Sequence, residues 1–511
     1  MGRTRIRRLA IVAVGLALVA SSAFVGTSAA RTVAGGTLVI GRTADVNTLD
    51  PQKATAFQAV QTLGLIYGTL VMLDSKLSIV PGLATSWKFS ADSQTLTFNL
   101  RPKVKFQNGA PFTSADVAAS LNRILNPATA AVARSNIAGI QSISTPSPLK
   151  VVLHLADPDV PILAALADLN TAMLSAADIQ SGAFATHPNG TGPFSFSSWT
   201  PNQTLKLVRN ATYWGGKPPL AGVQFRVIPD ETSVVSALKA NQIQMGLISD
   251  PLVARQVSGG GLKVLRQPAL SYHVLMLNDR HAPLDKQYVR LAIQCAIDRK
   301  QVLDSAALGE GQVTGPITSP AYRSNPSQRP CPQPNLTKAK KFLAAAGYPN
   351  GGITLNTIVE TGEYATAVAE AQSVQAQLAK IGITLNLQTL DSGTYVQRWL
   401  AADFDAAIAL NGGRVDPDTM YIRYFTSTGN LNKVAGYASP KLDTLFAQGR
   451  ATSDPAKRQA IYTQISKTLE GQGVWVWMFT AYDYYAISSK VQNFVPMANE
   501  SLQYLRQTTL G

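Results

Sequence analysis

Histidine and cysteine are scarce in this chain of 511 residues, which contains four histidines and two cysteines. None of the histidines, at positions 154, 187, 273 and 281, belongs to an H-E-x-x-H motif or to another spacing that places two ligands on one metal ion. His154 and His273 stand inside apolar segments and are expected to pack within strands. The sequence therefore predicts no metal site and no cofactor.

Motifs for catalysis are missing as well. The chain has neither a G-x-S-x-G nucleophile motif nor a P-loop, and the glycines at 309, 311 and 315 follow a predicted helix rather than a strand. Ser147-x-x-Lys150 matches the S-x-x-K pattern of penicillin hydrolases, but it stands in a Pro-rich loop and not at a helix start. We therefore predict that the protein is not an enzyme, with an exported hydrolase acting through Ser147 as the alternative.

Acidic residues are fewer than basic ones, 30 against 45, so the formal net charge is +15. Four of the arginines lie in residues 1–30, which hold no acid, and the rest of the chain therefore carries +11. Lys and Arg are scattered after residue 30 and form no basic run. This pattern indicates a solvated surface that favours proximity to an anionic membrane, and it predicts no nucleic-acid partner.

Residues 1–30 have the organisation of an export signal. A basic segment, Arg3–Arg8, precedes the apolar run Leu9–Val25, and the small residues Ser28-Ala29-Ala30 follow as a cleavage site. Cleavage there gives a mature protein that begins close to Arg31. The alternative is a retained membrane anchor, for which the run is at the short end of the necessary length.

Cys295 and Cys331 both follow the export signal, and outside the cytoplasm such a pair is often bridged. Cys295 is predicted to lie in a helix and Cys331 in the proline-rich loop 319–334. A disulfide and two unpaired cysteines remain the two interpretations.

The most informative stretch of the chain is 84–120. Thr95–Leu100 alternates apolar and polar residues, as does Val104–Phe106, which predicts a β-hairpin. Thr113, with Asp116 three residues later, has the pattern of a capping box at the start of a helix. The stretch therefore predicts a hairpin that packs beside a capped helix.

The order of these residues resembles the signature of the family 5 extracellular solute-binding proteins, which are the dipeptide, oligopeptide and nickel receptors of ABC importers. W-x-x-S-x-D-x-x-T-x-T-F-x-L-R begins at Trp87, and V-K-F-x-x-G-x-P-x-T-x-x-D-V begins at Val104. Further markers are G-T-G-P-F at 190–194, N-x-x-Y-W at 210–214 and P-L-D at 283–285. The resemblance covers residues 37–505.

The resemblance implies an α/β fold of the periplasmic-binding-protein type (type II, with an extra inserted lobe), in which the ligand cleft lies between lobes joined by two hinge strands. The expected organisation is a signal peptide at 1–30, a discontinuous lobe I at 31–74, 187–277 and 481–511, an inserted lobe II at 75–186 and lobe III at 278–480. Within lobe III, two successive βαβ patterns predict parallel strands in a doubly wound sheet. The strands near 271–278 and 474–480 are expected to form the hinge. The alternative is that both are core strands of one lobe.

The function implied by the resemblance is that of the extracytoplasmic solute-binding component of an ABC importer. Its partners would be a small-molecule or peptide ligand and the membrane permease subunits, and the protein is expected to be a monomer on the outer face of the cell envelope or in the periplasm. Many relatives carry a lipid-anchoring cysteine after the leader, and this chain has none. A sensor of the same fold that is not coupled to transport is the alternative.

In open α/β sheets, ligands bind beyond the carboxyl ends of the strands. Two predicted loops, 360–364 and 411–418, meet that condition. The expected ligand-binding residues are Thr55, Phe57, Thr361, Tyr364, Asn411, Arg414 and Asp416. A simpler interpretation of the second loop is a connector in which Asp416 and Asp418 cap the next helix, and for Asp418 the cap is the stronger prediction.

One departure from the family bears on the ligand. Dipeptide and oligopeptide receptors place an aspartate three residues before the D-P pair, where it pairs with the peptide's α-ammonium, and this chain has Gly413 there, followed by Arg414. A free amino terminus is therefore disfavoured unless Asp416 or Glu363 substitutes for the aspartate. No histidine lies in either loop, so the chain resembles the nickel receptors no more closely than the peptide receptors. The sequence predicts a small polar or anionic solute, such as an N-blocked peptide, an opine-like conjugate or a glycoside.

Overall fold

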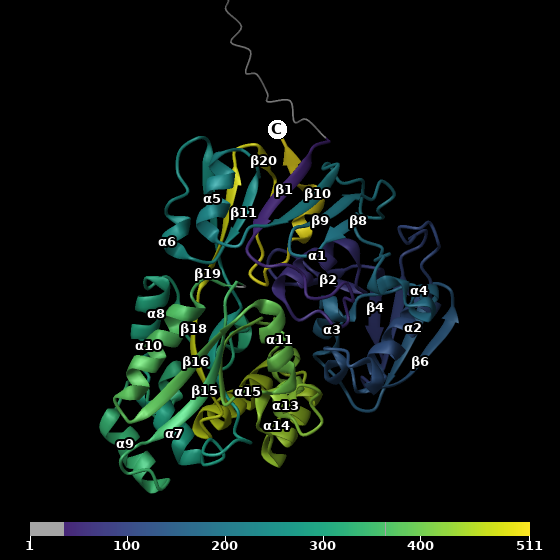
Figure 1. Cartoon of the computed structure of the whole chain (residues 1–511). Helices are drawn as coiled ribbons and strands as arrows, with labels where there is room; N and C mark the ends of the chain where they lie inside the picture. The colour runs from purple at the N-terminus through teal and green to yellow at the C-terminus, as the bar shows by residue number, and fades with distance from the viewer. Residues whose placement is uncertain (1–34, 363) are drawn as a thin grey trace, which may run out of the picture.

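The computed structural model describes residues 35–362 and 364–511, so the predicted export signal and Glu363 lie outside the described residues. Three lobes surround a central region (Figure 1): lobe I at the top of the view, lobe II at the right and lobe III at the lower left. Two large sheets form lobes I and III, and a smaller sheet forms lobe II. The predicted fold class, an α/β periplasmic-binding-protein-like architecture with an extra inserted lobe, is confirmed.

The sheet of lobe I collects strands from three separate parts of the chain, as the predicted discontinuity requires. Its order is β12-β19-β11-β1-β10-β9-β8, and β1 runs parallel to both β10 and β11. The strands are β1 Thr37–Arg42, β8 Phe194–Thr200, β9 Thr204–Arg209, β10 Gly222–Val227, β11 Met245–Ile248, β12 Leu262–Pro268 and β19 Tyr482–Ser488. The helices of this lobe are α1 Phe57–Ile66, α5 Glu231–Lys239 and α6 Pro251–Ala254. A short pair, β20 Val491–Gln492 and β21 Thr509–Leu510, closes its C-terminal end.

Lobe II contains the strand at 95–100 and the capped helix predicted for 84–120, but the predicted hairpin is corrected: the strand at 95–100 pairs with 84–89 before it, and 104–106 forms only an isolated bridge from Lys105 to Pro111. Its sheet has the order β4-β5-β7-β6, formed by β4 Ala84–Phe89, β5 Thr95–Leu100, β7 Lys150–Leu155 and β6 Ile140–Ser147. Helix α2, Ser114–Leu125, begins after Thr113, whose backbone N–H donates to Asp116 Oδ2 at 2.8 Å. The smaller elements are β2 Val71–Leu73, β3 Ile79–Pro81, α3 Ile162–Ala165 and α4 Ala176–Ser181. Ser147 pairs with Lys150 across the turn between β6 and β7, so no helix presents this serine as a nucleophile.

Lobe III is doubly wound. Its sheet has the order β14-β18-β13-β17-β15-β16, formed by β13 Tyr272–Leu277, β14 Gln312–Val313, β15 Ile353–Glu360, β16 Ile383–Leu390, β17 Ala406–Asn411 and β18 Trp475–Thr480. β15 is parallel to both β16 and β17, as the βαβ patterns predict. The helices are α7 Gln287–Ala296, α8 Arg299–Ala307, α9 Leu336–Ala345, α10 Ala367–Ala379, α11 Ser392–Ala401, α12 Pro417–Phe425, α13 Asn432–Ala435, α14 Pro440–Ala451 and α15 Pro455–Gly471.

Alternation along β18 shows how this sheet is buried on both faces. Val476 and Met478 pack with α7 to α10 on one side, whereas Trp475 and Trp477 pack with α12, α14 and α15 on the other. Successive strand residues point to opposite faces, so a run such as WVWMFT fills two cores at once.

Helices α7 and α8 are separated by a break in the backbone. The chain turns extended at Ile297, and Asp298 caps α8. Asn335 caps helix α9.

The predicted hinge also needs correction. β13 and β18 pair with each other inside the sheet of lobe III, so both are core strands of one lobe. The chain crosses between lobes I and III in the short links that follow β12 and β18. The boundary predicted at residue 277 therefore falls near residue 270.

Cys295 and Cys331 are joined by a disulfide that ties α7 to the loop before α9, with Cα atoms 5.1 Å apart. The bridge closes a segment of 36 residues, which restricts the unfolded chain. Replacing both cysteines by alanine should lower the free energy of unfolding by about 2–4 kcal/mol, measured by urea denaturation. The matched control is the wild-type protein with reductant, whose free energy of unfolding should fall to that of the variant. Equal free energies for the oxidised wild type, the reduced wild type and the variant would contradict a stabilising bridge.

Candidate ligand-binding site

The two loops predicted to hold ligand lie next to each other. β15 and β17 are parallel neighbours, so their carboxyl ends, at Glu360 and Asn411, reach the same edge of the sheet. This edge faces lobes I and II, and a cavity opens there between the three lobes. We call it the central cavity.

The central cavity receives side chains from all three lobes. Lobe I supplies Thr55 and Phe57, which precede and begin α1, and lobe II supplies Val132 and Asn170. Lobe III supplies a polar set and an aromatic set: Glu360, Asn411, Arg414, Arg423, Tyr395, Trp399 and Tyr424. Aromatic and apolar side chains with convergent polar groups among them are typical of small-molecule sites. The structure thus brings together four of the seven predicted residues, namely Thr55, Phe57, Asn411 and Arg414.

Arg414 spans the space between two lobes. Its Nε lies 2.7 Å from Asp168 Oδ2 in lobe II, and its backbone carbonyl accepts a hydrogen bond from Ser319 Oγ at 2.7 Å. Neither charged side chain is more than about a quarter exposed. Arg414 is therefore held across the cleft, with lobe III on one side and lobe II on the other.

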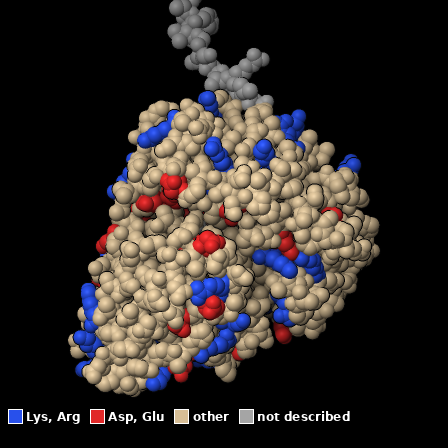
Figure 2. Space-filling view, viewed as in Figure 1, with Lys and Arg blue, Asp and Glu red and all other residues tan. Residues whose placement is uncertain are grey.

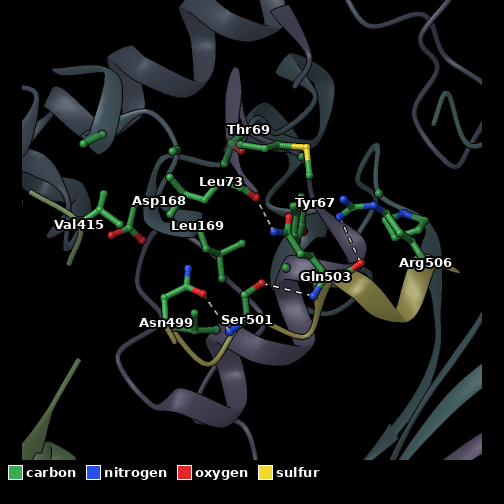
Figure 3. A pocket seen from close by; sticks show the side chains of 18 of the residues that line it. Tyr67, Thr69, Leu73, Asp168, Leu169, Val415, Asn499, Ser501, Gln503 and Arg506 are labelled. Carbon is green, nitrogen blue, oxygen red and sulfur yellow. Dashed lines mark hydrogen bonds between the residues drawn. The ribbon is translucent and has the colours of Figure 1, made fainter. Parts of the chain in front are cut away.

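A second cavity, which we call the outer cavity, lies beyond Arg414 (Figure 3). Tyr67, Thr69 and Leu73 line it from lobe I and the start of lobe II, and the C-terminal segment adds Gln503 and Arg506. Gln503 Nε2 donates to the Leu73 carbonyl oxygen at 2.6 Å, which fixes one wall. Because Val60, Gly413, Arg414 and Asn499 line both cavities, the two cavities meet at the Arg414–Asp168 ion pair.

Further polar contacts join lobe II to lobe III outside the cavities. Ser135 Oγ donates to Asn430 Oδ1 at 2.7 Å, and Asn136 Nδ2 donates to the Thr419 carbonyl oxygen at 3.2 Å. Arg450 Nη1 lies 3.4 Å from Asp159 Oδ2. The described structure is therefore a closed arrangement of the lobes.

Asp416 is placed differently from its predicted role. Its Oδ2 accepts from Arg458 Nη1 at 2.7 Å and its Oδ1 from Arg458 Nη2 at 2.9 Å, and it lies outside the lining of the central and outer cavities. Asp416 also accepts from the Asp418 backbone N–H at 2.9 Å, so it is the N-cap of α12. The stronger prediction for Asp418 was a cap, and it is wrong, because Asp418 is buried and holds Arg450 instead.

Thr361 and Tyr364 do not line the central cavity either. Thr361 Oγ1 donates to the Leu390 carbonyl oxygen at 3.1 Å. Tyr364 lines a third cavity beside the interlobe links, together with Phe57, Asp483 and Glu500.

The third cavity holds two carboxyl groups with raised pKa values. Burial raises the pKa of Asp483 to about 7. Burial, together with the neighbouring Asp483, raises the pKa of Glu500 well above its usual range. Glu500 also lines the central cavity.

The sequence analysis missed Arg423, Glu360 and the aromatic wall of the central cavity. Tyr395 and Trp399 stand four residues apart on α11, a spacing that signals a shared helix face and not which cavity the face meets. Arg423 lies inside α12 and has no motif around it. Only the packing of α12 against lobe II places it in the cleft.

In residues 35–362 and 364–511, no cluster of three or more His, Cys, Asp or Glu side chains is arranged to hold a metal ion. None of the helices in this part of the chain has the length and apolar character needed to cross a bilayer. Lys and Arg are dispersed over the visible face and do not gather in one patch (Figure 2).

These three lobes and the cavity between them define a solute-binding protein. The chain matches the family described as bacterial extracellular solute-binding proteins, family 5, over residues 78–433. It belongs to this family, the solute-binding proteins of ABC importers.

Relatives extend the match over nearly the whole chain. The glutathione-binding protein GsiB of Escherichia coli K12 is 27% identical over 497 residues, covering 92% of this chain and 93% of GsiB. The structure of AgaA from A. tumefacien R10 in complex with agropinic acid superposes with a TM-score of 0.86 at 28% identity, covering 93% of this chain and 99% of AgaA. The structure of DppA from Helicobacter pylori in complex with the peptide STSA superposes with a TM-score of 0.85 at 26% identity, covering 93% of this chain and 98% of DppA. Relatives of this chain are thus binding proteins.

Proposed function

We propose that this protein, after export and removal of residues 1–30, closes its lobes over one small polar or anionic solute and delivers it to the permease of an ABC importer without chemically changing it. The observation that carries the proposal is the central cavity, to which all three lobes contribute, with Arg414 bridging to Asp168 across it. A solute bound there contacts every lobe only when they are closed, so binding favours the closed state.

The proposed site consists of Thr55, Phe57, Asn411 and Arg414 in the central cavity. Tyr364 adds to it from the third cavity, which shares Phe57 with the central cavity. Thr361 and Asp416 are left out, because their polar groups are already bound to Leu390 and Arg458. The ligands named for the relatives, glutathione, agropinic acid and a peptide, are polar molecules that carry carboxylates, and they support a polar or anionic solute here.

Solute binding should compact the protein. We expect calorimetry to detect binding within a panel of reduced glutathione, dipeptides and N-acetylated dipeptides, with the N-acetylated form at least as good as the free one, because Gly413 offers no carboxylate to an ammonium. Small-angle scattering should show a smaller radius of gyration for the compound that binds. Co-purified solute identified by native mass spectrometry extends the panel.

The control is Arg414→Gln, which removes the charged group that spans the cleft and should weaken binding by on the order of tenfold or more. An unchanged radius of gyration for a compound with proven binding would contradict lobe closure. Tight binding of free dipeptides with no binding of their N-acetylated forms would contradict the proposed ligand class.

A further inference from the structure

Arg423 is a buried arginine that has no acidic partner among the described residues. The residue is 7% exposed, and within the described residues no Asp or Glu comes within the 4.0 Å of an ion pair with its guanidinium. Its Nε has no hydrogen-bond partner, and no hydrogen bond from its other nitrogens is found to any described residue. Its one cation–π neighbour is the adjacent Tyr424, whose ring centroid lies 5.0 Å from Cζ.

Other buried arginines of this protein do not share this isolation. Arg329, 1% exposed at its side chain, pairs with Glu470 at 3.0 Å and also donates to the Thr314 carbonyl oxygen. Arg458, 3% exposed at its side chain, pairs with Asp416 at 2.7 Å.

A buried guanidinium is strongly disfavoured unless polar partners compensate its lost hydration. Arg290 and Arg299 are buried and form no ion pair with a described acid either, but they donate to backbone carbonyl oxygens, among them those of Leu284 and Trp477. Arg423 has neither kind of partner among the described residues, and a ligand in the cavity can supply it.

The position of Arg423 agrees with that role. It lines the central cavity together with Arg414, Asn411 and the aromatic residues Trp399 and Tyr424. Two acidic residues line the same cavity, Glu360 and Glu500, and neither forms an ion pair with Arg423. Arg414 is paired with Asp168, so among the described residues this carboxylate serves Arg414 and not Arg423.

We propose that Arg423 binds an anionic group, a carboxylate or a phosphate, of the solute held in the central cavity. This inference rests on the proposed solute-binding function and narrows the ligand to an anion. Arg423 lines the cavity, and a planar guanidinium can offer two parallel hydrogen bonds to such a group. The nearby aromatic side chains exclude water, which strengthens the interaction.

The first test needs no ligand. The test is made in a buffer without polyvalent or carboxylate anions. Arg423→Met should leave the urea midpoint of unfolding unchanged or raise it, because methionine removes the unpaired buried charge and fills a similar volume. The matched control, Arg329→Met, should lower the midpoint, because it leaves Glu470 buried without its partner. An equal loss in both variants would show that Arg423 has a structural role and would overturn the proposal.

The second test measures, by calorimetry, the affinity for two matched pairs of a charged and a less charged compound: succinate with succinamide, and reduced glutathione with its diethyl ester. Inorganic phosphate is tested as a further anion. The wild-type protein should bind at least one of the anions, and it should bind the paired compound that lacks the charge on the order of tenfold more weakly. Arg423→Met should bind both members of the pair with similar affinity. Binding of phosphate and not of succinate identifies a phosphate site, and the reverse a carboxylate site. If the wild type closes on a neutral solute and no anion binds, the anion assignment is overturned while the solute-binding function stands. If Arg423→Met still binds the anion more tightly than its paired compound, the assignment of Arg423 to the anionic group is overturned as well.

Discussion

Replacing Asp416 by alanine should lower the free energy of unfolding by about 3–5 kcal/mol, the cost of breaking a buried ion pair. Arg458 is 3% exposed at its side chain and gives both terminal nitrogens to the two oxygens of Asp416. Without that carboxylate, the guanidinium keeps only the Gly449 carbonyl and two tyrosine hydroxyls. The same substitution removes the N-cap of α12, so part of the loss is the cap itself.

Asp454 provides the matched control for Asp416. Both aspartates precede a proline and cap a helix of lobe III, but Asp454 is exposed and has no arginine partner among the described residues. Asp454→Ala should therefore cost only about 1 kcal/mol. Urea denaturation of the two variants measures the difference, and Asp416→Ala with Arg458→Met should recover part of the loss. If both single variants lose the same small amount, the Arg458–Asp416 pair contributes nothing beyond the cap.

The parts of the fold that follow from local sequence could be predicted. Alternation at 95–100 and the Thr113–Asp116 spacing define strand β5 and the capped helix α2, because the interacting groups are a few residues apart. The hairpin partner of β5 was predicted at 104–106 and is β4 instead. The βαβ order of lobe III follows from helix and strand lengths alone. Local patterns failed at Ile297, where apolar residues keep helical spacing although the backbone turns extended before α8.

The site was only half predictable, for a physical reason. Strand ends indicate which loops reach the cleft, and this placed Asn411 and Arg414 correctly in the central cavity. What each charged group does depends on partners far along the chain. Asp416 meets an arginine 42 residues away, and Arg414 meets an aspartate in another lobe. The isolation of Arg423 is equally invisible in sequence, because it is the absence of a partner in three dimensions.

The packing around Gly413 leaves no room for a side chain at the position where the family resemblance implies an aspartate in peptide receptors. A Cβ atom built on Gly413 would lie 2.0 Å from the carbonyl oxygen of Leu270, which is in the link between lobes I and III. Contacts this short to backbone cannot be relieved by a side-chain rotation. The loop and the interlobe link therefore touch backbone to backbone, and no carboxylate fits between them.

We accordingly expect Gly413→Asp to abolish solute binding, with a loss of a hundredfold or more for whichever compound the wild type binds, and not to create binding of free dipeptides. Overpacking of this kind costs on the order of 1–3 kcal/mol, and the strain falls on the loop that carries Arg414 and on the link that must adjust when the lobes close. Calorimetry measures the affinity and urea denaturation the stability. Gly471→Ala is the control, because a Cβ there meets nothing within 4 Å, and it should leave binding unchanged. Tight binding of free dipeptides by Gly413→Asp would show instead that the loop moves aside and that the missing carboxylate alone sets the ligand class.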